Sequence, residues 1–170
     1  MTAIIEQVET HPRPAVIEAS TRQYGVLPWR LSGNGELQIL LITSLTRRRW
    51  VVPKGWPASG QAPFMAAAIE AFEEAGVIGD IGPNIVAEYS CMSEREDGTA
   101  LPFRVALFGF RVRGTLTHWQ DAGKRKRRWF NVSEAAKLID EPELAEFLAR
   151  LDEEPEILTR QPRRRILPAS

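Results

Sequence analysis

The stretch from Gly55 to Val77 constrains the fold most strongly, because it predicts a helix with two chemically different sides. Pro63 suits the first turn of a helix, and Gly76 is typical of the residue that follows a helix. Between these residues, small and apolar side chains recur at helical spacing, which indicates a face that packs on a core. The remaining side of the predicted helix is acidic.

The acidic side is formed by Glu70, Glu73 and Glu74. At about 100° per residue, these carboxylates fall within about a third of the helix circumference. Like charges three and four residues apart destabilise a helix, so they need either full solvation or a cation between them. Mg²⁺, which prefers oxygen ligands, suits this arrangement. A solvated acidic face without a ligand is the ordinary alternative, because glutamate is a good helix former.

The residues before the helix favour a binding site over a plain solvated face. Val51 and Val52 end a predicted strand, and the chain then passes through Lys54 and Gly55 into a glycine-containing loop. A strand, a loop and an acidic helix therefore follow one another, and together they predict a strand–loop–helix cradle.

Residues 55–77 resemble the Nudix box, whose pattern is Gly, five residues, Glu, seven residues, then Arg-Glu-aliphatic-x-Glu-Glu-x-Gly-aliphatic. The spacing fits without a gap, and the positions that match in kind are Gly55, Glu70, Glu73, Glu74, Gly76 and Val77. Two positions depart, because Gln61 replaces the first glutamate and Ile69 replaces the arginine. In the family this arginine helps to orient carboxylates, so its loss bears on catalytic efficiency rather than on the fold. The departures remove one charge of each sign, which we interpret as a compensated change.

The resemblance implies a hydrolase that acts on acid anhydrides in phosphorus-containing substrates. Nudix hydrolases cleave a nucleoside diphosphate linked to another moiety, or related pyrophosphates. By this resemblance, Glu70 and Glu74 are the expected ligands of Mg²⁺, with Mn²⁺ as the alternative, and the carbonyl of Gly55 joins them. Glu73 is expected to be a further ligand or the catalytic general base, and we assign it the second role.

Basic and aromatic residues outside the box indicate the substrate class. Residues 119–130 and 47–53 resemble the corresponding stretches of the diphosphoinositol polyphosphate phosphohydrolases, a branch that also takes diadenosine polyphosphates. Residues 53–55 look like the Pro-Lys-Gly of diadenosine tetraphosphate hydrolases. Two basic clusters beside an acidic helix suit a ligand with many phosphates. The predicted substrate-binding residues are Arg49, Lys54, Arg104, Arg125 and Lys126.

These residues also have simpler interpretations. Arg104 lies in a predicted interior strand and can equally extend its guanidinium to solvent. The run from Lys124 to Arg128 can be a solvated turn or an RNA contact, and alternate residues of a strand cannot all face one pocket. Three tryptophans are candidates for stacking on a nucleobase, although burial in the core is their more ordinary role: Trp29, Trp56 and Trp119.

Composition limits the class of protein. With 170 residues, 44% of them hydrophobic, the chain is long enough for one domain with a substantial core. The formal net charge is zero, so overall charge neither favours nor disfavours nucleic acid. Cys91 is the single cysteine, which excludes an intramolecular disulfide and agrees with a reducing compartment. Neither a membrane span nor a signal-peptide pattern is present, so we expect a cytoplasmic protein without membrane contact.

The order of predicted elements indicates a layered α/β (α+β) domain. Residues 1–20 are expected to be an extended arm, residues 21–152 the Nudix domain, and residues 153–170 a tail. Strands are predicted over 24–30, 37–44, 50–52, 85–92, 101–112 and 127–132, and helices from Pro63, from Ser133 and over 141–151. The resemblance sharpens this fold to a Nudix-like α/β/α sandwich with a mixed β-sheet.

Three functional hypotheses follow. The first is a Mg²⁺-dependent pyrophosphohydrolase that cleaves phosphoanhydride bonds of a diphosphoinositol or diadenosine polyphosphate by attack of metal-activated water. The second is a catalytically weakened Nudix module that binds a phosphorylated ligand, motivated by Gln61 and Ile69. The third is an RNA-binding or RNA-end-processing protein, motivated by basic clusters at 47–49, 124–128 and 163–165. The sequence makes no prediction of the oligomeric state.

Overall fold

A computed structural model of the chain describes residues 22–94, 97–162 and 164–166. The predicted arm at residues 1–20 lies outside this part of the chain. The strands are β1 (Arg22–Leu31), β2 (Leu37–Thr43), β3 (Trp50–Val51), β4 (Lys54–Gly55), β5 (Val77–Glu94), β6 (Ala100–Thr115), β7 (Arg127–Asn131) and β8 (Arg164–Ile166). The helices are α1 (Pro63–Ala75), α2 (Val132–Leu138), α3 (Pro142–Glu153) and α4 (Glu156–Thr159).

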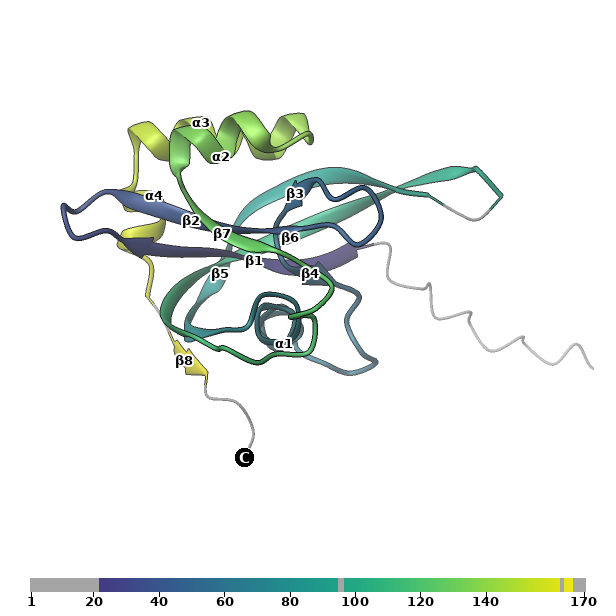
Figure 1. The fold of residues 1–170 in the computed structure, drawn as a ribbon, viewed down its shortest axis with the longest axis horizontal. Coiled ribbons are helices and arrows are strands. Elements are labelled where there is room, and N and C mark those ends of the chain that lie inside the picture. The colour runs from purple at the N-terminus through teal and green to yellow at the C-terminus, as the bar shows by residue number, and fades with distance from the viewer. Residues whose placement is uncertain (1–21, 95–96, 163, 167–170) are drawn as a thin grey trace, which may run out of the picture.

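The strands form one mixed sheet in the order β3-β2-β1-β6-β5-β8, with β4 paired to β1 and β7 paired to β2. β1 and β6 run parallel, whereas β5 and β6 form a long antiparallel hairpin. In Figure 1, α1 lies on one face of the sheet, and α2 and α3 lie on the other. The predicted α/β/α sandwich with a mixed sheet is therefore confirmed.

Two hydrophobic clusters fill the spaces between these layers. β6 supplies both of them, because successive side chains of a strand point to opposite faces of the sheet. Val105 and Leu107 belong to the cluster that includes α2 and α3, whereas Phe108 and Phe110 belong to the cluster that includes α1. The buried side of α1 consists of alanines, which let the helix backbone come close to the sheet: Ala66, Ala67, Ala68, Ala71 and Ala75.

The predicted helix over the acidic segment is confirmed from Pro63 to Ala75. It ends at Gly76, whose φ of 61° lies in the left-handed region that glycine adopts without strain. The strand predicted over 85–92 is longer than expected, because β5 already begins at Val77. A shift of register between Ile81 and Ile85 lets the strand continue past the intervening residues.

Part of the segment that we predicted to be a tail has regular structure. α4 buries Leu158 in the cluster that includes α3, and β8 pairs with β5, with Gly79 opposite Ile166. Elements of four and three residues are too short to show a hydrophobic period, which is why the sequence pattern did not reveal them.

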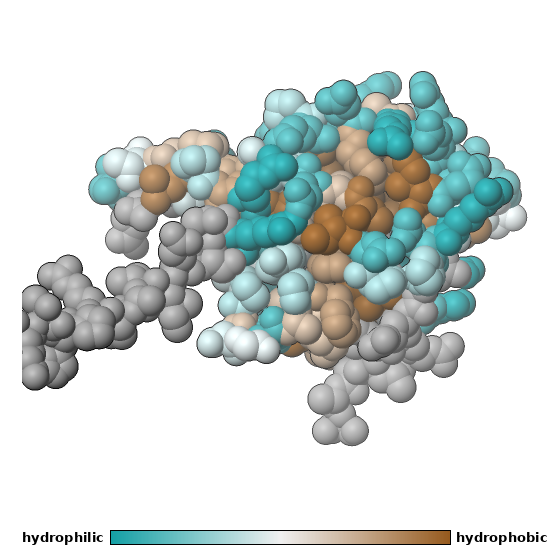
Figure 2. Space-filling view, turned by 180° about the vertical axis from the view of Figure 1, so that it is seen from behind, coloured by the Kyte–Doolittle hydropathy of each residue, from teal (hydrophilic) through white to brown (hydrophobic). Residues whose placement is uncertain are grey.

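Hydrophobic and hydrophilic residues are unevenly distributed over the surface of the domain (Figure 2). Viewed from behind, hydrophobic side chains gather near the middle of the body, with hydrophilic residues around them (Figure 2). The β5–β6 hairpin projects from the body and carries hydrophobic side chains of its own (Figures 1 and 2). Within the described residues, no helix is long and apolar enough to cross a membrane.

Candidate active site

The site is built where β4 meets α1, so that a glycine backbone faces a carboxylate. A Cβ atom added to Gly55 would overlap the side chain of Glu70. In addition, the backbone N–H of Lys54 donates a hydrogen bond to Glu74 Oε2 at 3.2 Å. The predicted cradle therefore brings Gly55, Glu70 and Glu74 together, and a larger residue at position 55 would force the Glu70 carboxylate to move.

The electrostatics of this carboxylate pair favour a loss of negative charge. Burial, followed by the charges of Glu74 and Glu73, raises the pKa of Glu70 to about 7. Burial also raises the pKa of Glu74, although Arg125 opposes that effect. Either a shared proton or a bound cation would reduce the electrostatic repulsion between two adjacent carboxylates whose pKa values are raised.

Arg125 neutralises part of the charge of Glu74. Its Nη2 lies 3.2 Å from Glu74 Oε1, and its Nε donates to Asp121 Oδ2 at 2.7 Å. Nη1 donates to the carbonyl oxygen of Thr43 at 3.2 Å, and the side chain is only 10% exposed. Glu74 therefore has a guanidinium partner from the segment between β6 and β7, whereas position 69 of the box holds isoleucine.

Sequence reasoning missed Asp121, which is buried and holds Arg125 in place. Its backbone N–H also donates to the carbonyl oxygen of Glu73 at 3.1 Å. The available signal was the spacing of four residues between Asp121 and Arg125, which is typical of a local acid–base pair. Nothing in the sequence pattern linked that pair to Glu74.

The same segment closes the carboxyl end of α1. Trp119 Nε1 donates to the carbonyl oxygen of Glu74 at 3.2 Å, and Arg127 Nη1 donates to the carbonyl oxygen of Ala75 at 3.0 Å. The Arg127 guanidinium also lies 3.9 Å from the ring centroid of Trp119. These donors satisfy carbonyl groups that a helix end leaves without partners, and they fix the last turn of α1, which carries Glu73 and Glu74.

The side chains of the predicted basic run, residues 124–128, point in two different directions. Arg125 and Arg127 turn inward to α1, whereas Lys124, Lys126 and Arg128 are exposed. Lys126 is attached to the sheet through its backbone N–H, which donates to Thr43 Oγ1 at 2.9 Å. A substrate role of Lys126 stays a prediction.

Two predicted substrate-binding residues form ion pairs with α3 or the residues before it. Arg49 pairs with the buried Glu141, which precedes α3. Arg104 Nη1 lies 3.0 Å from Glu143 Oε1 and donates to Ser90 Oγ at 2.8 Å. Both guanidinium groups therefore have acidic partners away from α1, and binding to a substrate would require them to exchange these partners.

The donor set fits a divalent cation in part. Glu70, Glu74 and the carbonyl of Gly55 are hard oxygen ligands, and burial raises the pKa of both carboxyl groups, which a bound cation would oppose. Across the described residues, no three Asp, Glu, His or Cys side chains are grouped closely enough to form a metal site. Gln61 faces its own loop, where its side-chain oxygen accepts a hydrogen bond from the N–H of Ala58 at 3.1 Å.

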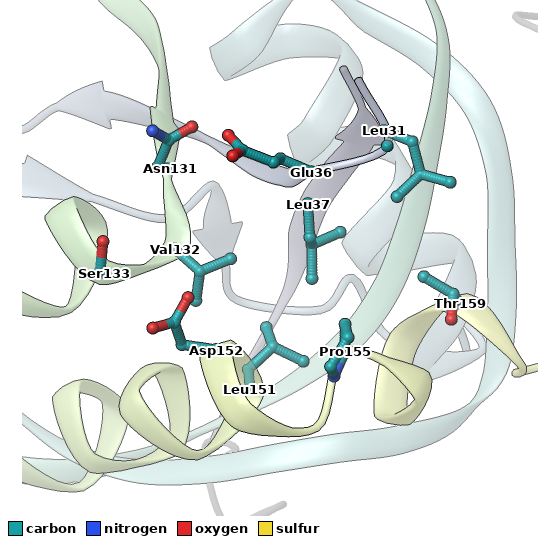
Figure 3. A pocket seen from close by; sticks show the side chains of 11 residues that line it. Leu31, Glu36, Leu37, Asn131, Val132, Ser133, Leu151, Asp152, Pro155 and Thr159 are labelled. Carbon is teal, nitrogen blue, oxygen red and sulfur yellow. The ribbon is translucent and has the colours of Figure 1, made fainter. Parts of the chain in front are cut away.

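A separate cavity of about 500 Å³ lies between the β1–β2 hairpin, the start of α2 and the end of α3 (Figure 3). It is lined by apolar side chains such as Leu31 and Leu151 and by polar ones such as Glu36, Asn131 and Asp152. Because none of its lining residues belongs to β4 or α1, this cavity is not part of the carboxylate site.

The chain is similar in sequence to known proteins. The family model of the NUDIX domain matches residues 21–151. Diphosphoinositol polyphosphate phosphohydrolase 3-beta of Bos taurus is 33% identical over 121 residues, which cover 68% of this chain and 70% of that protein. Mitochondrial Nudix hydrolase 13 of Arabidopsis thaliana is 32% identical over 150 residues, or 76% of this chain and 74% of that protein.

Solved structures show the same fold. The binary complex of a C. elegans Ap4A hydrolase has a TM-score of 0.59 and 20% identity, and the match covers 79% of this chain and 96% of that one. A Nudix hydrolase from M. smegmatis, RenU, has a TM-score of 0.52 and 18% identity, with 80% of this chain and 87% of that one covered.

Proposed function

Since this chain belongs to the Nudix family, we propose that it is a Mg²⁺-dependent pyrophosphohydrolase that cleaves a phosphoanhydride bond of a small polyphosphorylated molecule. The observation that carries the proposal is the fit of the Glu70 carboxylate against Gly55, with Glu74 beside it. A plain solvated acidic helix would not need one of its carboxylates packed this closely against a neighbouring backbone.

Each carboxylate has a proposed task. Glu70, Glu74 and the Gly55 carbonyl would hold the cation, which when bound would neutralise charge on the phosphate oxygens and lower the pKa of a water molecule. Glu73 would accept the proton of the attacking water. Arg125 would keep Glu74 in place rather than contact substrate, since its donors already have protein acceptors.

The substrate class is proposed from relatives and from local charge. Relatives are named for diphosphoinositol polyphosphates, and a structural neighbour is named for Ap4A. Lys54, which is partly exposed and precedes Gly55, and the exposed Lys126 are the basic groups best suited to bind a polyphosphate here. A cytoplasmic location remains part of this proposal.

Assays on a substrate panel test the proposed activity. The panel comprises diadenosine polyphosphates, inositol pyrophosphates, ADP-ribose and nucleoside triphosphates, each with Mg²⁺, Mn²⁺ or EDTA. We expect metal-dependent cleavage of one class, abolished by Glu74→Gln and retained by Glu146→Gln, which changes an exposed glutamate of α3. Tight binding of any member without turnover by the wild type would instead support the weakened binding module.

The second candidate function, RNA binding, has limited support from the described residues. Lys124, Lys126 and Arg128 are exposed together, which favours a polyanion contact. Binding to RNA through them should weaken steeply as the salt concentration rises. An affinity for single-stranded RNA that is absent, or that does not depend on salt, would remove this candidate.

A further inference from the structure

Trp56, the residue after Gly55, leaves a large part of its side chain in solvent. It is 50% exposed, although tryptophan is a highly buried residue on average. The two other tryptophans considered for base stacking are engaged elsewhere, since Trp29 is buried in the core and Trp119 lies under the Arg127 guanidinium. Among the described residues, about half of the Trp56 surface is therefore left uncovered.

The indole of Trp56 is supported from behind by the core. Its ring centroid lies 5.3 Å from that of Phe103, with the ring planes inclined by 47°. Phe103 is buried in the cluster that includes α2 and α3, so this contact attaches the indole to the hydrophobic core. Leu101, which is exposed, lies two residues earlier on the same side of β6 and extends the apolar surface.

The position of this surface along the chain relates it to the reaction site. Trp56 directly follows Gly55, so their Cα atoms are about 3.8 Å apart, and Gly55 faces the Glu70 carboxylate. The indole packs with the cluster that includes α2 and α3, whereas Glu70 and Glu74 project from α1, so a ligand that contacts both would span the backbone of Gly55 and Trp56. An aromatic ring is the group that gains most from such a surface, because it can stack on the indole.

We propose that Trp56, supported by Phe103, is the stacking site for a nucleobase, which makes a nucleoside polyphosphate the preferred substrate class over an inositol pyrophosphate. Inositol has no aromatic ring, so it gains less from the indole face than a nucleobase does. This inference rests on the proposed function, because the carboxylate site determines where the phosphates lie.

Equilibrium binding separates stacking from phosphate recognition. The two probes are adenosine 5′-(α,β-methylene)diphosphate and methylenediphosphonate, which share an uncleavable P–C–P unit and differ by the adenosine. Calorimetric titrations with Mg²⁺ compare the wild type with Trp56→Ala, Trp56→Phe and Met92→Ala. Met92 is a matched control, because it is an exposed apolar residue of the same hairpin on the opposite side of the strand from Cys91, the partner of Phe103.

We expect Trp56→Ala to weaken binding of the adenosine probe about tenfold or more, since stacking on an aromatic side chain contributes on the order of 1–3 kcal/mol per base. Binding of methylenediphosphonate should stay within about twofold of the wild type, Trp56→Phe should retain most of the affinity, and Met92→Ala should change neither value. Thermal unfolding confirms that each variant is folded.

The inference is overturned if Trp56→Ala weakens both probes equally, if it weakens neither, or if the wild type binds the adenosine probe no more tightly than methylenediphosphonate. Neither probe can be hydrolysed at its P–C–P unit, so these outcomes do not depend on turnover. A failure of the proposed hydrolase activity would appear in the substrate panel and not in this comparison.

Discussion

Arg125 Nη2 lies 3.2 Å from Oε1 of Glu74, although the two residues are 51 positions apart in the sequence. The same guanidinium binds the Asp121 carboxylate and the Thr43 carbonyl, so each of its three nitrogen atoms has an acceptor. This arrangement joins the segment between β6 and β7 to the acidic face of α1. We propose that it keeps Glu74 in place in a Nudix box that has isoleucine at position 69.

Replacing Arg125 should impair both stability and activity. Arg125→Ala leaves the buried Asp121 and the mostly buried Glu74 without their shared cation, so we expect the free energy of unfolding to fall by about 3 kcal/mol or more. Arg125→Lys restores the charge but not the three directed donors, so it should recover only part of the loss. Urea denaturation and turnover measure the two effects, with Lys124→Ala as the exposed control. A fully stable and active Arg125→Ala would contradict the positioning role.

Substitution of Gly55 tests the closeness of β4 to the helix. A methyl group at this position overlaps the Glu70 side chain, so Gly55→Ala should displace the carboxylate and strongly reduce turnover. Gly33→Ala is the matched control, because its added Cβ would meet no atom within 4 Å and should leave the rate unchanged. Equal rates for the two variants would show that the Glu70 carboxylate need not lie against the backbone of residue 55.

The raised pKa of Glu70 predicts how stability depends on pH in the absence of divalent cations. Glu70 has a pKa of about 7 when folded, compared with an ordinary value of 4.5, so the folded protein binds this proton more tightly than the unfolded chain does. The contribution of Glu70 to the free energy of unfolding is therefore fully present below about pH 4.5 and is lost as the pH rises through about 7.

Glu70→Gln should remove this contribution, because glutamine does not titrate. Denaturation in EDTA across pH 5 to 8 should then show a shallower decline for Glu70→Gln than for the wild type. Parallel curves for the two proteins would be inconsistent with a raised pKa at Glu70.

Restoring the standard box residues tests whether the chain is a weakened enzyme. Because Arg125 already provides a guanidinium to Glu74, we expect Gln61→Glu combined with Ile69→Arg to raise turnover little. Steady-state kinetics of the double variant beside the wild type measure this. A large increase would mean that the two departures had disabled the site, and it would favour the binding module.

The sequence was sufficient to predict those helices and strands that are indicated by residues close together in the chain. The helix limits at Pro63 and Gly76 and the order of strands around the acidic helix followed from residue type and spacing. The sequence could not predict which basic residues turn inward, because that depends on how distant segments pack. Arg104 and Arg49 illustrate this limit, since each finds its acidic partner in or beside α3 rather than in α1.

Binding of a divalent cation tests the central claim most directly, namely that Glu70 and Glu74 form the metal-holding face of a hydrolytic site. We would titrate Mn²⁺ into the protein and follow free Mn²⁺ by electron paramagnetic resonance, for the wild type, Glu70→Gln, Glu74→Gln and the exposed control Glu146→Gln. The account predicts a Mn²⁺ site in the wild type and in Glu146→Gln that is lost or strongly weakened in both site variants. Undiminished Mn²⁺ binding by Glu70→Gln and Glu74→Gln, or no binding by the wild type, would contradict it.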